Sequence, residues 1–344
     1  MKKKLNGKLI FNIVCLMVPI GLIIYFLTSE NGFMDLMENA SKLNKWWLLS
    51  GFLFQFSNVL IDAVVLYLLT NNYDKSYNFK KAFKATAVGQ FFSIITPGAV
   101  GGQPMQLYCM SKQKIDTGIA SSCLVQKFLV YQTTITLYSF FAMIFNLDLF
   151  YGELKGLMLS LALFGFLSHV VVVAFIFVFS FNKKLASSIT TFIFNILAKM
   201  KIIKDPENQI KKLEKQMDFF HESNLKLYKN KKLLIITCLL TIVQLTLIFS
   251  ISYLVYRSFG LFGASASDMI TAQAFVTMVS SFMPLPGGSG AAEGSFYVFF
   301  KIFFTQDTIK SAILIWRIIT YFFNVIIFAP FANIGKIDKK SKNN

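Results

Sequence analysis

The chain has 344 residues, of which 55% are hydrophobic and 16% aromatic, and its mean hydropathy is +0.58. This apolar content is typical of integral membrane proteins rather than soluble domains. The formal net charge of +17 comes from lysines between apolar runs, which favours membrane orientation over nucleic-acid binding. Four cysteines without paired spacing and only two histidines argue against a disulfide framework or a zinc site.

Apolar runs long enough to cross a bilayer recur along the chain. The first, 9–28, follows several lysines as a signal peptide would, but its length and the polar residues after it predict a retained helix. Lysine-rich segments at the N-terminus, at 70–84, at 182–232 and in the tail are predicted to be cytoplasmic, together with both termini. The further predicted spans are 46–69, 119–145, 156–181, 233–256 and 309–331.

The long connection 182–232 is predicted to form amphipathic helices over 185–200 and 207–230 at the cytoplasmic membrane surface. Such helices either pack on the bundle or contact anionic lipid of the inner leaflet, and the sequence leaves both interpretations open. The pattern does not indicate a second domain. We therefore expect residues 1–344 to form a single membrane domain.

Two short segments, SIITPGAVGGQP (93–104) and SSFMPLPGGSGAAEG (280–294), interrupt apolar arms with proline and glycine. Their Pro-Gly pairs lie 189 residues apart, and the lysines around the first segment predict a helical hairpin entering from the cytoplasm. The second segment follows span 233–256 and is predicted to enter from outside. Breaks at matching positions of two halves are typical of transporters with inverted repeats.

The predicted fold is thus an all-α integral membrane protein with about six full transmembrane helices and two re-entrant hairpins. The inverted repeat comprises residues 46–145 and 233–331. Non-helical backbone at membrane depth is tolerated only where it is buried in protein or lines a wet cavity. We therefore expect the two Pro-Gly tips to meet near the bilayer midplane and to face a cavity.

Ionisable residues inside the predicted spans and tips are functional candidates because burying a charge in a membrane is costly. Arg317 stands out because 32 of the 34 basic residues are lysines, and a guanidinium binds phosphate through two N–H groups. Lys127 lies at an offset of 190 from Arg317, so the two predict a two-cation site for an anionic headgroup. The alternative is that they neutralise Asp62 and Glu293 as structural ion pairs.

Glu293 follows the second tip, where the dipole of a new helix would favour a carboxylate. It is also a candidate counter-ion of Arg317 or a proton carrier. Asp62 and His169 are possible coupling residues, although a hydrogen-bonded core histidine is the favoured reading of His169. Glycines and exposed amides at the tips suit close approach to an anion. The remaining predicted substrate-binding residues are Pro97, Gly101, Gly102, Gln103, Pro286, Gly287, Gly288 and Gly290.

The two tips, TPGAVGGQPMQLYCMSKQ (96–113) and PLPGGSGAAEGSF (284–296), resemble the lysylphosphatidylglycerol synthase transmembrane-region family. This is the flippase-like module of the multiple-peptide-resistance proteins. The family's T-P-x-x-x-G-G-x-P and P-x-P-G-G-x-G-x-x-E-G blocks fall on Thr96–Pro104 and Pro284–Gly294. The resemblance implies a bacterial cell-membrane protein that moves an anionic or aminoacylated phospholipid, or a lipid-linked substrate, between leaflets.

Bifunctional members of that family append a soluble aminoacyl-transferase domain, which is expected to be missing here. We therefore predict that the chain is not an enzyme and that it needs no catalytic residue, cofactor or metal. Two other functions stay open. One is a secondary transporter of a small anion coupled to protons or Na⁺, and the other is a lipid-binding membrane subunit of a separate lipid-modifying synthase. The oligomeric state is not predicted.

Overall fold

We analysed a computed structural model of the whole chain. It describes residues 43–146, 156–185, 187–189, 191–192, 222, 225–226, 229–281, 283 and 285–332. The predicted span 9–28 and most of the amphipathic helices expected over 182–232 lie outside these residues. Within the described part the chain is helical and contains five helices long and apolar enough to cross a membrane. This confirms the predicted all-α membrane fold.

The five long helices follow the predicted apolar runs closely. Side chains of Asn44, Asp116 and Asn230 accept backbone N–H bonds at the beginnings of three of them, which explains where those helices begin. The last span bends through a π-helical and a 3₁₀ turn. The bounds are α3 (Lys45–Asn71), α6 (Thr117–Phe145), α7 (Leu157–Phe181), α10 (Lys231–Ser258), and the continuous series α13 (Gln306–Arg317), η2 (Ile318–Phe322), α14 (Phe323–Phe328) and η3 (Ala329–Ala332).

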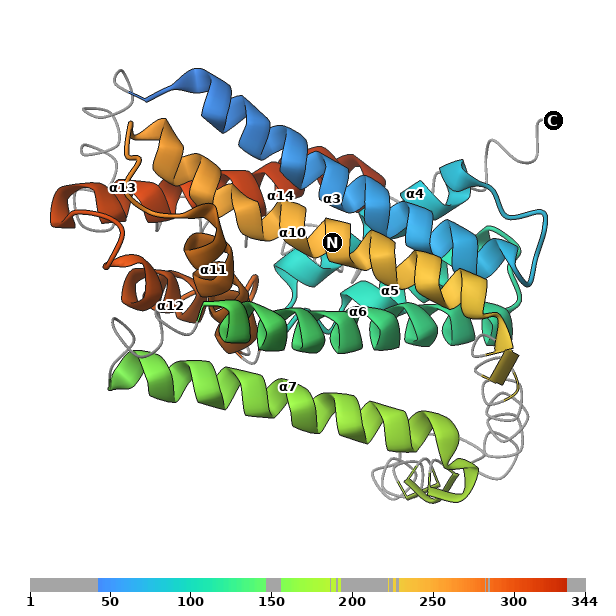
Figure 1. Cartoon of the computed structure of the whole chain (residues 1–344). Coiled ribbons are helices and arrows are strands. Elements are labelled where there is room, and N and C mark those ends of the chain that lie inside the picture. Colours follow the sequence, from blue (N-terminus) through green and yellow to red (C-terminus); the bar gives the residue numbers. More distant parts are fainter. Residues whose placement is uncertain are drawn as a thin grey trace, which may run out of the picture.

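Helices α3 and α10 form the long central pair of the bundle and run antiparallel along their whole length (Figure 1). At one end the N–H of Asn44 donates to the carbonyl of Ser258 at 2.9 Å. At the other end Asn230 Nδ2 donates to Asn72 Oδ1 at 3.4 Å. These two contacts define the ends of the bundle. We call them the Asn44 end and the Asn72 end.

The first helical hairpin consists of α4 (Phe79–Ile95) and α5 (Gly102–Lys112). Both of its outer ends lie at the Asn72 end. Asn71 Nδ2 donates to the carbonyl of Tyr77 at 3.0 Å just before α4, and Gln113 Nε2 donates to the carbonyl of Lys81 at 3.0 Å just after α5. The chain therefore enters the bundle along α4, turns at the first tip and returns along α5.

The second hairpin consists of α11 (Ala266–Ser280) and α12 (Ala291–Phe300), and it begins and ends at the Asn44 end. The N–H of Ala264 donates to Tyr256 Oη at 3.1 Å before α11, and the Phe304 ring lies 5.3 Å from the Tyr256 ring after α12. The hairpins thus approach from opposite ends. Their tips meet in an antiparallel backbone bridge between Pro97 and Pro286.

Helix α7 lies at the edge of the bundle, against α6 and α11 (Figure 1). Its inward side contains Ala162 and His169, both buried, while Leu163, Leu167 and Val171 are exposed. An apolar outward side is what a helix in contact with lipid tails requires. Helix α7 therefore adds a span at the edge of the bundle, and its Gly165 packs against Met278 and Val279 near the end of α11.

Candidate functional site

The two tips follow the same backbone path, 189 residues apart. In the first, the N–H of Ala99 donates to the carbonyl of Thr96; in the second, the N–H of Gly288 donates to the carbonyl of Leu285. Gly98 and Gly287 both have a φ of 60°, and the following residues, Ala99 and Gly288, have φ values of 57° and 64°. Helices α5 and α12 then begin at equivalent positions, Gly102 and Ala291.

The tips differ in which group accepts the hydrogen bond of the first backbone N–H of the half-helix after the turn. In the first tip, the N–H of Gly101 donates to Thr96 Oγ1 at 2.9 Å, so the acceptor is a hydroxyl from before the turn. In the second tip, the equivalent N–H of Gly290 donates to Glu293 Oε2 at 2.6 Å, so the acceptor is a carboxylate from after the turn. Only the second arrangement places a negative charge at the tip.

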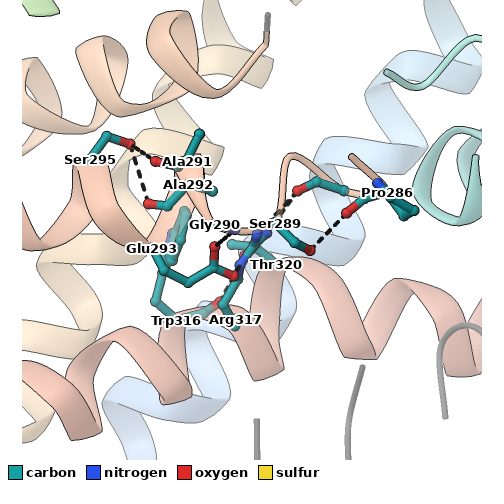
Figure 2. Close-up of polar contacts among 11 residues, drawn as sticks. Pro286, Ser289, Gly290, Ala291, Ala292, Glu293, Ser295, Trp316, Arg317 and Thr320 are labelled. Atoms are coloured by element: carbon teal, nitrogen blue, oxygen red, sulfur yellow. Dashed lines mark hydrogen bonds and ion pairs between the residues drawn. The ribbon is translucent and has the colours of Figure 1, made fainter. Parts of the chain in front are cut away.

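Arg317, at the end of α13, connects that carboxylate to the loop itself (Figure 2). Its Nε donates to Glu293 Oε1 at 2.5 Å, and its Nη1 and Nη2 both donate to the carbonyl of Gly287 at 3.1 Å. The side chains of this ion pair are only 7% and 13% exposed. Among the described residues, three of the five guanidinium N–H groups therefore have an acceptor.

Aromatic rings hold Arg317 in place. Its guanidinium lies 5.3 Å from the ring centres of both Trp316 and Tyr321. Tyr321 sits in η2, a π-helical turn that begins directly after Arg317, and such turns are frequent at functional sites. A Cβ at Gly287 would lie 2.0 Å from the Tyr321 ring, so only glycine lets the loop come this close.

Lys127, the predicted partner of Arg317 in a two-cation site, is instead paired elsewhere. Its Nζ lies 2.8 Å from Asp62 Oδ2, and these side chains are 16% and 11% exposed. Gly51 of α3 packs against Ile319, beside Arg317, and Asp62 is eleven residues further along α3, or about 16 Å. The structure therefore separates the two cations and gives each its own carboxylate, as the alternative interpretation proposed.

The other predicted site residues divide between the tips and the bundle. Gln103 is exposed at the beginning of α5, next to the exposed first tip, while Gly101 is half-buried and Gly102 is buried. A Cβ at Gly102 would lie 1.8 Å from Ser93 Oγ, so this glycine lets α4 and α5 pack closely. His169 lies in the middle of α7, where its Nδ1 is 2.5 Å from Gln132 Nε2 and joins α7 to α6.

Three features of the site escaped sequence analysis. The carbonyl of Gly287 is a backbone acceptor, which no side-chain pattern marks. The hydroxyl of Thr96 accepts a hydrogen bond from the N–H of Gly101, five residues further along the chain. Tyr321 could have been found, because it lies four residues after Arg317 and residues at this spacing share one helix face. Its contact with the second tip depends on the tertiary packing.

Comparison with known proteins places this arrangement in a family. Residues 10–327 match the family described as the lysylphosphatidylglycerol synthase TM region. The chain belongs to this family. A UPF0104 membrane protein of Archaeoglobus fulgidus is 24% identical over 319 residues, which cover 90% of this chain and 93% of the relative. These matches confirm the predicted resemblance and support a multi-pass membrane location and a role related to membrane lipids.

The geometry of the site suits reversible binding of an anion. Arg317 carries a charge that it cannot lose, and its present partner, Glu293, is also held by the amide of Gly290. A phosphate could take the place of the carboxylate on the guanidinium. The same carboxylate holds the Gly290 amide through its other oxygen, so the tip has two groups of a kind that binds anions, the guanidinium and this amide.

Proposed function

We propose that the protein is a lipid flippase or scramblase that moves an anionic or aminoacylated phospholipid, or a lipid-linked substrate, between leaflets. The observation that carries this proposal is the position of Arg317. Its guanidinium binds both the tip carbonyl of Gly287 and the carboxylate of Glu293, in the tip that meets the other hairpin. A headgroup phosphate that binds there would act directly on the contact between the hairpins.

The exposed first tip supports a wet cavity beside this contact. Pro97, Gly98 and Ala99 are exposed, and Val100 is 72% exposed. These residues lie where hairpins from opposite ends of the bundle meet, and irregular backbone exposed at membrane depth requires water or polar groups around it. We infer that the hairpins are re-entrant and form an inverted repeat, with the first tip facing the path of the headgroup.

In this mechanism the headgroup phosphate replaces Glu293 on Arg317. Release of the carboxylate from Gly290 loosens the second tip from α12, because that amide loses its only described acceptor. The contact between Pro97 and Pro286 can then open, and the two hairpins exchange access between leaflets. The acyl chains stay in the bilayer throughout. The protein makes and breaks no covalent bond in this scheme, so we propose that it is not an enzyme.

The first experiment measures leaflet exchange in liposomes that contain the purified full-length protein. Labelled phosphatidylglycerol is compared with labelled phosphatidylcholine. We expect fast exchange that favours phosphatidylglycerol and that is lost in Arg317→Ala. Lys301→Ala is the matched control, because Lys301 is an exposed cation at the end of α12. Its exchange rate should equal that of the unmodified protein, and unchanged exchange in Arg317→Ala would overturn the assignment.

Outcomes without lipid exchange point to the other two functions. Uptake of inorganic phosphate driven by a pH or Na⁺ gradient would identify a small-anion transporter, with Glu293 or Asp62 as the coupling carboxylate. Activity that requires a co-expressed lipid-modifying synthase would identify a lipid-binding subunit. We place the lipid mover first because the chain belongs to the lysylphosphatidylglycerol synthase TM region family and the buried Arg317 pair suits a headgroup phosphate.

A cross-link tests the opening of the tips separately. Residues opposite each other in an antiparallel bridge have Cα atoms about 4.5–5.5 Å apart, within the range of a disulfide. Pro97→Cys with Pro286→Cys, in a background without the four native cysteines, should therefore cross-link on oxidation. We expect exchange to stop when the disulfide forms and to recover on reduction. Full exchange by the oxidised protein would exclude opening at this contact.

A further inference from the structure

The second of the two arginines, Arg257, is held in an aromatic cluster at the Asn44 end. It lies in the last turn of α10. Its guanidinium carbon is 4.1 Å from the ring centre of Phe262, 4.9 Å from that of Trp47 and 5.6 Å from that of Tyr253. Contacts of a cation with ring faces orient the guanidinium plane and leave its edge for hydrogen bonds.

That edge lacks a charged partner among the described residues. Nη1 donates to Tyr253 Oη at 2.7 Å, a neutral acceptor. Nε is covered and no described group accepts its hydrogen bond. An unsatisfied N–H at a covered position is unfavourable, and a guanidinium edge matches two oxygens of a phosphate. Since the side chain as a whole is half-buried, a ligand reaches it from the molecular surface.

The surroundings favour a lipid over a free ion. Phe262, in contact with the cation, is 66% exposed, and tryptophan and tyrosine, here Trp47 and Tyr253, gather where membrane meets water. Lysines concentrate at the Asn72 end of the bundle. Lys81 is one of them, and its carbonyl accepts a hydrogen bond from Gln113 at that end. The charge rule that assigns a lysine-rich end to the cytoplasm therefore puts Arg257 at the outer leaflet.

We propose that Arg257 binds the phosphate of an anionic phospholipid in the leaflet at the Asn44 end, with Trp47 and Phe262 against the glycerol and upper acyl region. Arg257 lies beside Asn44, and Arg317 lies near Gly51 of the same helix, seven residues or about 10 Å along its axis. The inference rests on the proposed function in one respect. A headgroup that leaves Arg317 would reach Arg257 next.

The test uses the fluorescence of Trp47 in the full-length protein. Trp46→Phe and Trp316→Phe make Trp47 the sole tryptophan of the three in the chain. Liposomes contain either phosphatidylglycerol or phosphatidylcholine with brominated acyl chains, which quench a nearby indole. One cation near an anionic surface contributes about 1 kcal/mol, so phosphatidylglycerol should quench at about fivefold lower mole fraction. Arg257→Gln should remove this preference, and Arg257→Lys should keep part of it.

Each other outcome overturns the assignment. Equal quenching by both lipids excludes an anionic-lipid site, and a preference that survives in Arg257→Gln assigns it to another residue. Loss of the preference on adding inorganic phosphate identifies a free-anion site instead. If Arg257→Gln does not fold, Arg257→Lys and Tyr253→Phe still test the hydrogen-bonding edge of the guanidinium. Leaflet exchange is measured separately, so a failure at Arg257 leaves the role of Arg317 intact, and the reverse also holds.

Discussion

The two hairpin tips have the same turn but are closed by different acceptors, and under the proposed function only one of these closures responds to a charged ligand. The first tip is closed by the hydroxyl of Thr96, a neutral group from its own loop. The second is closed by Glu293, which in turn is bound by Arg317 from another helix. A neutral local closure cannot respond to a charged ligand. A closure through an ion pair can, because a phosphate competes for the same guanidinium.

The two buried ion pairs extend this comparison. Lys127 pairs with Asp62 between α6 and α3, and neither is a tip residue, whereas the Arg317 pair includes the tip residue Glu293. A flexible lysine chain can redirect its ammonium when its partner is removed, whereas the guanidinium of Arg317 is also fixed by the carbonyl of Gly287. The cost of breaking each pair should therefore differ, although the cations occupy equivalent places in the sequence.

The largest expected effect comes from neutralising the carboxylates. Glu293→Gln leaves Arg317 charged and covered, so we expect the free energy of unfolding to fall by about 3–5 kcal/mol. Asp62→Asn should cost less than half of that, because the flexible side chain of Lys127, which is 16% exposed, can turn its ammonium toward other polar groups. Denaturant unfolding of both variants in the same detergent measures the difference. Equal losses would mean that the two pairs are energetically alike and that the tip plays no special role.

The next effect concerns the contact of the second tip with Tyr321. Gly287→Ala puts a Cβ 2.0 Å from the Tyr321 ring at a φ of 60°. We expect a loss of about 2–4 kcal/mol from overpacking and backbone strain. Gly287→Ala combined with Tyr321→Ala should recover part of it, leaving the strain. If the double variant is no more stable than Gly287→Ala, the ring contact does not limit this position.

A smaller effect distinguishes the packing of the two hairpins. Gly102 and Ala291 begin equivalent half-helices, but a Cβ at Gly102 would lie 1.8 Å from Ser93 Oγ and 2.9 Å from the carbonyl of Gly89. Gly102→Ala should therefore destabilise the protein by about 1–3 kcal/mol. Ala291→Gly should cost about 0.5–1 kcal/mol through chain entropy alone. Thermal unfolding compares them, and the opposite order would contradict the closer approach of α4 and α5.

The smallest effect tests the neutral closure itself. Thr96→Val removes the acceptor of the Gly101 amide while keeping the shape of the side chain. We expect a loss of about 1 kcal/mol, as for other capping hydroxyls. Thr96→Ser keeps the hydroxyl and should cost less, which hydrogen exchange at Gly101 can confirm. A large loss of lipid exchange in Thr96→Val with unchanged stability would mean that the first tip also takes part in the switch.

The sequence by itself determined the membrane class, the approximate boundaries of the five described spans and the two broken segments. Hydropathy sets the spans because each must satisfy its backbone within lipid, and proline and glycine mark where that rule is broken. The family also follows from the residues of the tips. His169 was correctly interpreted as a hydrogen-bonded residue of the bundle.

Only the tertiary structure decided which charges meet. Equal spacing suggested that Lys127 and Arg317 share a site, yet an offset along the chain does not specify which carboxylate lies within a few ångströms. Asp62 is 65 residues from Lys127 and Glu293 is 24 from Arg317. Helix packing brings each pair together, and it also brings Tyr321 against Gly287. Charges pair in a low-dielectric interior only when they lie close together in space. The order of residues alone does not give that distance.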